Sequence, residues 1–106
     1  MKLVNLTPHP VTFVADDGEK LLELPGNPNP PRAQESREAQ GTVNGIPVSK
    51  VHMGEVQGLP APQAGVGYIV SRIVAEAVHR NDLFVPDQTV RDEQGRIIGC
   101  RALAQV

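Results

Sequence analysis

The sequence predicts an α+β fold, a small antiparallel β-sheet of about six strands with one packed helix. Short apolar stretches separated by turn residues recur along most of the chain, which is typical of strands. The 106 residues include 10 glycines and 10 prolines, which favours turns and short strands over a helical bundle. Only Arg72–Arg80 has convincing helical spacing, so we expect this segment to cover one face of the sheet.

The predicted helix follows a short strand within the segment Gly65–Asp82. Tyr68–Val70 is apolar and largely β-branched, as expected of a buried strand. Ser71 then fits the N-cap, because its side chain can accept a hydrogen bond from a free backbone amide of the first turn. The apolar side chains of the helix share one stripe, which consists of Ile73, Val74, Ala77 and Val78.

The end of the predicted helix is basic. His79 and Arg80 occupy its last turn, where positive charge suits the helix dipole, and Asn81 is an acceptable left-handed stop. A longer strand through Ile73 is the alternative, because β-branched residues dominate this part of the chain.

The N-terminal region predicts a hairpin. Lys2–Thr7 and Val11–Val14 read as strands, separated by a stiff bend in which two prolines flank His9. Asp16-Asp17-Gly18 is a turn sequence, and Lys20–Leu24 makes the returning strand.

The middle of the chain is less regular. Four prolines make Pro25–Arg32 a rigid loop, and the polar segment Ala33–Gln40 is either an edge strand or a mobile excursion. Asn44-Gly45 predicts a two-residue hairpin turn, and Pro47 confines the returning strand to an edge or a bulge. A weak strand continues over Val51–Glu55.

The C-terminal region predicts a short strand and a hairpin. The apolar run Leu83–Val85 is expected to end at Pro86. Val90–Arg101 forms a hairpin around the turn Asp92–Gly95. No internal repeat and no long linker divides the chain, so residues 1–106 are expected to form a single domain.

Composition argues against several classes of protein. The net charge of −2 and the 3 % aromatic content disfavour a long nucleic-acid site. No apolar stretch approaches the length of a membrane span, and no signal-peptide core opens the chain. The single cysteine cannot form an intrachain disulfide, which favours a reducing compartment. We therefore expect a soluble protein of the cytoplasm.

The sequence predicts no catalytic residue, metal site or cofactor. His9, His52 and His79 lack ligand spacing, and Cys100 has no second thiol. Cys100 is expected to face the core on its strand, where a thiol is usually inert packing. Ser71 lacks the GxSxG context of a nucleophile.

The start of the predicted helix and the last hairpin suggest an anion-binding site instead. Free amides at the start of the helix, with Ser71 and Arg72, favour phosphate, and the guanidinium of Arg101 offers a bidentate clamp for phosphate or a base edge. Tyr68 could stack on a base, although an ordinary core role is the commoner one for such a residue. Taken singly, each arginine of the last hairpin is more often a solubility charge.

Self-association is also expected. The core is small and aliphatic, and several sheet edges are open, so edge strands and the proline-rich loop would be buried between subunits. His9 and Arg32 lie on rigid loops from which they could complete the site of a neighbouring subunit.

Three motifs resemble a family of small phage and bacterial proteins. They are the opening sequence Asn5–Val11, the pair Gly58–Pro60 and Tyr68–Ser71, and the final pair Val90–Asp92 and Gly99–Leu103. The resemblance covers most of the chain apart from Pro25–Val56. It extends to the phage anti-defence "sponge" proteins that counter the Thoeris system. That similarity implies oligomers that bind cyclic ADP-ribose-type signals, and in some cases cyclic oligonucleotides, without cleaving them.

The expected function is thus non-catalytic sequestration of a small cyclic nucleotide immune signal. Two alternatives remain: a small enzyme that uses Cys100 with a histidine on a nucleotide-like substrate, and a structural or interaction protein of a phage.

Overall fold

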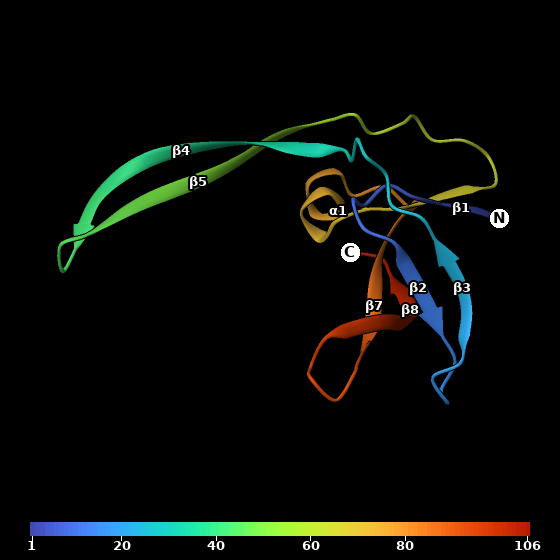
Figure 1. The fold of residues 1–106 in the computed structure, drawn as a ribbon. Helices are drawn as coiled ribbons and strands as arrows, with labels where there is room; N and C mark the ends of the chain where they lie inside the picture. Colours follow the sequence, from blue (N-terminus) through green and yellow to red (C-terminus); the bar gives the residue numbers. More distant parts are fainter.

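The computed structural model describes all 106 residues and divides visibly into two parts. The body comprises residues 1–31 and 58–106, and the arm is the long two-stranded ribbon formed by β4 (Arg32–Val43) and β5 (Ile46–Gln57) (Figure 1). The radius of gyration is 16.8 Å. A compact domain of this length would have a radius of roughly 13 Å, and the projecting arm accounts for the excess.

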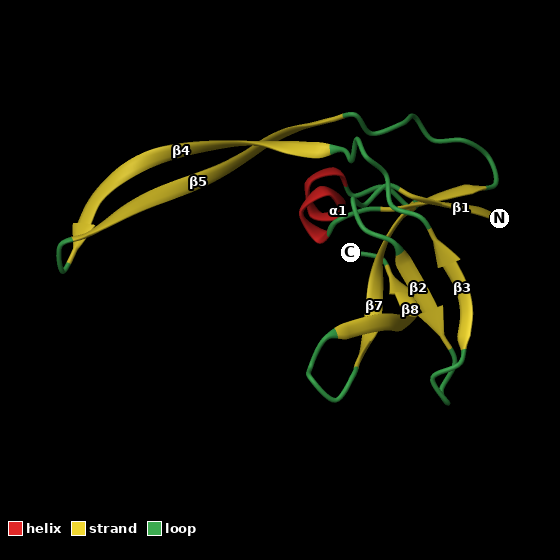
Figure 2. Ribbon diagram, viewed as in Figure 1, coloured by secondary structure: helices red, strands yellow, loops and turns green.

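A six-stranded sheet forms most of the body. Its strands in chain order are β1 (Lys2–Asn5), β2 (Val11–Val14), β3 (Lys20–Leu24), β6 (Val66–Ile69), β7 (Leu83–Arg91) and β8 (Ile97–Ala104). They lie side by side in the order β1-β6-β7-β8-β2-β3. The chain is mostly β-sheet with a single short helix, so its fold is of the predicted α+β kind (Figure 2).

The expectation of a purely antiparallel sheet is wrong. β1 pairs with β6, β6 with β7 and β2 with β8 in parallel, whereas β2–β3 and β7–β8 are antiparallel. The helix explains one of these pairs, because it carries the chain from the end of β6 back to the start of β7 as a parallel crossover. Hairpin turns can be read from local sequence, but crossovers bring together strands that are distant in the chain.

The helix α1 (Arg72–Val78) begins where it was predicted to begin. Ser71 is the N-cap, and its hydroxyl accepts a hydrogen bond from the Val74 amide at 3.3 Å. The buried face consists of Val74 and Ala75, so the predicted stripe is rotated, and Ile73 is 57 % exposed.

The predicted helix end is wrong by two residues. The left-handed residue is His79, with φ of 53°, and not Asn81. Arg80 therefore lies outside the helix, where its guanidinium hydrogen-bonds to Asp82 at 2.6 and 2.9 Å and donates to the Pro60 carbonyl at 2.9 Å. These contacts hold the chain against the preceding loop and turn it out of the helix before another turn can form.

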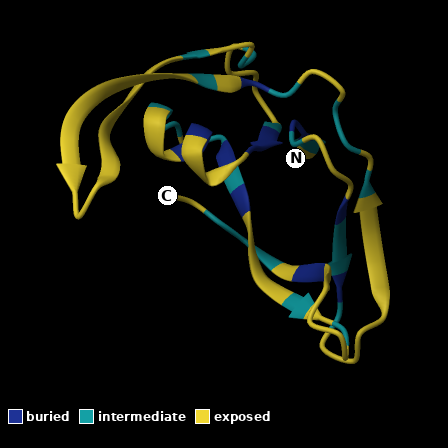
Figure 3. Cartoon of the chain, turned by 60° about the vertical axis from the view of Figure 1, so that its left-hand side comes forward, coloured by how far each residue is buried: buried dark blue, intermediate teal, exposed yellow.

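The core of the body is made mainly of aliphatic side chains and draws on both ends of the chain. Figure 3 shows the chain coloured by burial, with the arm almost entirely exposed. The larger cluster consists of Leu6, Tyr68, Val70, Val74, Ala75, Leu83 and Val85. The smaller one joins Val11, Ile69 and Cys100, which confirms that Cys100 faces the core.

β7 is longer than predicted, because it runs through Pro86 to Arg91. β6 pairs with β7 only at Leu83 and Phe84, so from Pro86 onward β7 has β8 as its only neighbour. A proline on such an edge leaves no ladder hydrogen bond unmade on the open side.

The arm confirms the predicted turn and the edge-strand reading of Ala33–Gln40. Asn44 and Gly45 both have positive φ, 51° and 79°, as a two-residue hairpin turn requires. The base of the arm contacts α1. Every arm residue is exposed apart from Ala33 and Val56, which are half-buried.

Candidate functional site

The cavity that contains two of the six predicted binding residues, Arg32 and Ser71, lies between the base of the arm, the proline loop and the start of α1. Its volume is about 360 Å³, within the range of small-molecule sites. Leu6, Pro31 and Val74 are among the apolar side chains that form its walls. Arg32 and Ser71 are among its polar lining residues, so tertiary structure brings together two residues 39 positions apart in the chain. We call this space the arm-base cavity.

Arg32 provides the positive charge of the arm-base cavity. Its guanidinium makes no ion pair within the chain. The one carboxylate that lines the cavity, Glu35, is paired with Arg37 at 2.6 Å. The arm-base cavity therefore has a cationic side chain, Arg32, without a carboxylate partner. Its guanidinium can donate two parallel hydrogen bonds to a phosphate or carboxylate.

Ser71 adds a hydroxyl to the same wall. Its oxygen caps α1, and its proton has no acceptor within the chain, so it is free to donate to a ligand. Arg72 is not part of the cavity, because its side chain lies along α1 and pairs with Glu76 at 2.9 Å. His9 is exposed and follows Pro8, a cavity residue, but does not line the cavity itself.

Tyr68 cannot stack on a base in this chain. It is 3 % exposed and belongs to the larger core cluster, with its hydroxyl donating to the Ala61 carbonyl at 3.4 Å. The role proposed for its ring in binding is therefore corrected to core packing. The strand position that predicts burial for Ile69 and Val70 applies equally to Tyr68.

Arg101 lies on a different surface from Ser71. Its guanidinium is close to Asp16 in the β2–β3 turn, with 3.4 Å to the backbone oxygen and 3.9 Å to the carboxylate. There it lines a separate shallow hollow of about 270 Å³ together with Leu3 and Phe13. The expectation that one cavity joins Tyr68, Ser71 and Arg101 is therefore not met within the chain.

Asn5 is a structural residue whose importance the sequence did not reveal. It is 7 % exposed, and its amide nitrogen lies at 2.9 to 3.3 Å from the carbonyl oxygens of His9, Leu24 and Pro25. Its side-chain oxygen accepts from the amide and hydroxyl of Thr7 at 2.9 and 2.7 Å. This network shapes the turn before β2 and holds it against the proline loop, which positions one wall of the arm-base cavity. The run Asn5–Thr7 before two prolines was the available clue, because Asn and Thr side chains commonly bond to nearby backbone.

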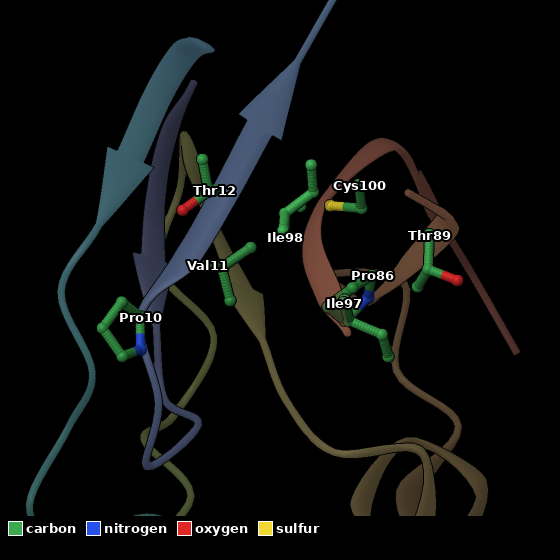
Figure 4. A pocket seen from close by; sticks show the side chains of 9 residues that line it. Pro10, Val11, Thr12, Pro86, Thr89, Ile97, Ile98 and Cys100 are labelled. Atoms are coloured by element: carbon green, nitrogen blue, oxygen red, sulfur yellow. The ribbon is translucent and has the colours of Figure 1, made fainter. Parts of the chain in front are cut away.

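A second cavity, of about 350 Å³, opens between β2 and the β7–β8 hairpin (Figure 4). β2 and β8 are paired only at Phe13 and Cys100, so the two strands separate beside that pair. Val11 and Thr12 lie on one side, with Ile98 and Cys100 on the other (Figure 4). No charged residue lines this cavity, which we call the apolar cavity.

Cys100 is poorly suited to nucleophilic chemistry. Burial raises the pKa of its thiol above the ordinary value, and the backbone hydrogen bonds that oppose this rise are a smaller influence. No histidine lines the apolar cavity beside it. No group of three His, Cys, Asp or Glu side chains in the chain is placed to hold a metal ion.

The chain matches no protein-family model, no curated protein and no solved structure. Its single helix, of seven residues, is far too short to cross a membrane.

Proposed function

We propose that this protein binds a small anionic ligand without transforming it, and that the ligand is a cyclic nucleotide signal of the cyclic ADP-ribose type. The observation that carries the proposal is the unpaired guanidinium of Arg32 in a cavity walled by prolines and aliphatic side chains. Such a cavity combines one cation with apolar surface for a base or ribose, and its rigid loops reduce the entropy lost on binding.

The residues of this site support binding more than catalysis. Arg32 and the Ser71 hydroxyl can hold a phosphate, but no histidine lines the arm-base cavity to act as a base. Cys100, the nucleophile of the enzyme alternative, belongs to the other cavity, where burial raises the pKa of its thiol and so disfavours the reactive thiolate.

Calorimetric titration with cyclic ADP-ribose isomers and cyclic di- and trinucleotides tests the proposal. We expect one ligand class to bind and to be recovered unchanged by chromatography. Replacing Arg32 with Gln removes a charge-assisted hydrogen bond of about 1.5–3 kcal/mol, so the Kd should rise at least about tenfold. Arg96→Gln is the matched control, since Arg96 is an exposed arginine outside the cavity.

Two results would count against the proposal. Conversion of the bound nucleotide to a product would contradict binding without catalysis. Absence of heat across the whole panel at several hundred micromolar would contradict the ligand class, and it would favour the second candidate, a structural or interaction protein of a phage. The free arm with its exposed apolar side chains is the observation that favours this second candidate.

A further inference from the structure

The arm lacks the contacts that normally stabilise a β-ribbon. An isolated two-stranded ribbon is marginal in water and needs another strand, helix or sheet to cover it. Here β4 and β5 pair with each other, and only the base of the arm packs on α1. All of residues 34–55 are exposed, so the chain itself covers neither face of the outer arm.

The outer end of the arm is uncharged and exposes aliphatic side chains. Residues 39–49 contain no charged side chain, although 21 % of the chain is charged. Val43 and Ile46 flank the turn and are 60 % and 65 % exposed, and Val48 follows them at 37 %. Apolar side chains grouped on a projecting hairpin without any charge mark a contact surface. We call residues 39–49 the arm tip.

The body carries an acceptor surface of matching chemistry. Ile97 and Ile98 on the rim of the apolar cavity are 58 % and 49 % exposed. The arm tip and the rim of the apolar cavity together carry five of the ten exposed valine, leucine and isoleucine side chains of the chain.

We propose that the arm tip of one copy of this protein docks into the apolar cavity of a second copy, with Val43 and Ile46 as the apolar anchors. The occupant is a second copy because one chain presents both halves of the contact, and its own arm tip contacts no part of its own body. Docking of an uncharged tip into an uncharged cavity buries no unpaired charge. A charged partner segment would bury one, because the cavity has no charged residue to pair with it.

The length of the arm is sufficient to carry its tip to a neighbouring copy. Strands of 12 residues extend about 40 Å, and the tip projects well clear of its own body (Figure 1). Reciprocal exchange gives a closed dimer, whereas successive docking in one direction gives a ring; both use the same contact.

Sedimentation velocity across a range of protein concentrations tests this contact, and no ligand is needed. We expect the wild-type chain to associate and Ile46→Glu to raise the dissociation constant at least about tenfold, because a charge would enter an apolar cavity. Ile98→Glu should have the same effect from the acceptor side. Val106→Glu is the matched control, since Val106 is 42 % exposed and lies outside both surfaces.

Mixing the two variants identifies the contact itself. Ile46→Glu retains an intact cavity and Ile98→Glu retains an intact tip, so the mixture restores one intact contact per pair and should associate more tightly than either variant alone. Circular dichroism of each variant should match the wild type, because both side chains are largely exposed. Three results would overturn the proposal: a monomeric wild type at several hundred micromolar, association unchanged by Ile98→Glu, or no recovery on mixing. These sedimentation experiments contain no nucleotide. Failure of the protein to bind a nucleotide would therefore not change their outcome, and the two proposals can be refuted independently.

Discussion

The body and the arm are built from the same kinds of strand and turn but differ completely in burial. Every one of the 15 buried residues belongs to the body, and none belongs to the arm. Both parts contain well-formed hairpins: the turn before β8 is held by the Asp92 side chain, and the arm turn by the positive φ of Asn44 and Gly45. Local turn chemistry thus produces a hairpin in either place.

What differs is the surface that each hairpin meets. β7 and β8 lie in a six-stranded sheet with α1 and apolar side chains beneath them, whereas β4 and β5 have only each other beyond their base. The free energy of folding therefore resides in the body, and the arm depends on contacts that the single chain does not provide. The same kind of substitution should therefore change the free energy of unfolding by very different amounts in the body and in the arm.

The largest expected effect comes from truncating a core side chain of the body. Leu83 is 2 % exposed, and Leu83→Ala should lower the free energy of unfolding by about 3 kcal/mol because it leaves a cavity. Chemical denaturation measures this loss. The matched arm variant Ile46→Ala should change the stability of the dilute monomer by less than about 0.5 kcal/mol. Equal costs at both positions in dilute solution would contradict the contrast between the two parts.

The next largest effect concerns the polar core of the body. Asn5→Ala removes the donor to three carbonyl groups and the acceptor for Thr7, and we expect it to cost about 2–3 kcal/mol through unsatisfied buried groups. Asn81→Ala, at an exposed position, should be nearly neutral. Denaturant midpoints of the two variants provide the comparison, and similar midpoints would show that the network contributes little.

The smallest effect is a change in the pH dependence of stability. Arg80 lowers the pKa of Asp82 below its ordinary value, chiefly through their hydrogen bonds. Between the pKa of Asp82 in the folded state and its higher pKa in the unfolded state, the unfolded state binds more protons. The stability that the pair contributes is therefore fully present above the unfolded-state pKa, and it is lost as the pH falls through the folded-state pKa. Asp82→Asn should flatten the stability curve below about pH 4.

Arg80→Met should flatten the same acidic limb, because the carboxylate of Asp82 would lose the partner that lowers its pKa. Some slope should persist in both variants, since Lys20 and Thr12 lower the pKa of Glu23 through hydrogen bonds. Thermal unfolding between pH 2.5 and 7 measures the effect. A slope identical to that of the wild type in both variants would exclude the pair as its source.

Much of the site was recognisable in the sequence only as separate parts. Ser71 as a cap, the proline loop before Arg32 and the buried face of Cys100 all follow from local rules, and the structure confirms them. The presence of Arg32 and Ser71 in one cavity could not be predicted, because it depends on the angle at which the arm leaves the body. Tyr68 was assigned to binding on its chemistry, although its strand places it in the core.

The sequence alone determined the local features of this protein: its hairpin turns, its helix start and the uncharged tip between Ala39 and Ser49. These features depend on backbone preferences and side-chain polarity over a few residues. Only the tertiary structure decided the parallel pairing of β1 with β6 and of β2 with β8, the early helix end at His79 and the separation of Arg101 from Ser71. Each of these depends on contacts between residues far apart in the chain, whose relative positions are set by how the whole body packs.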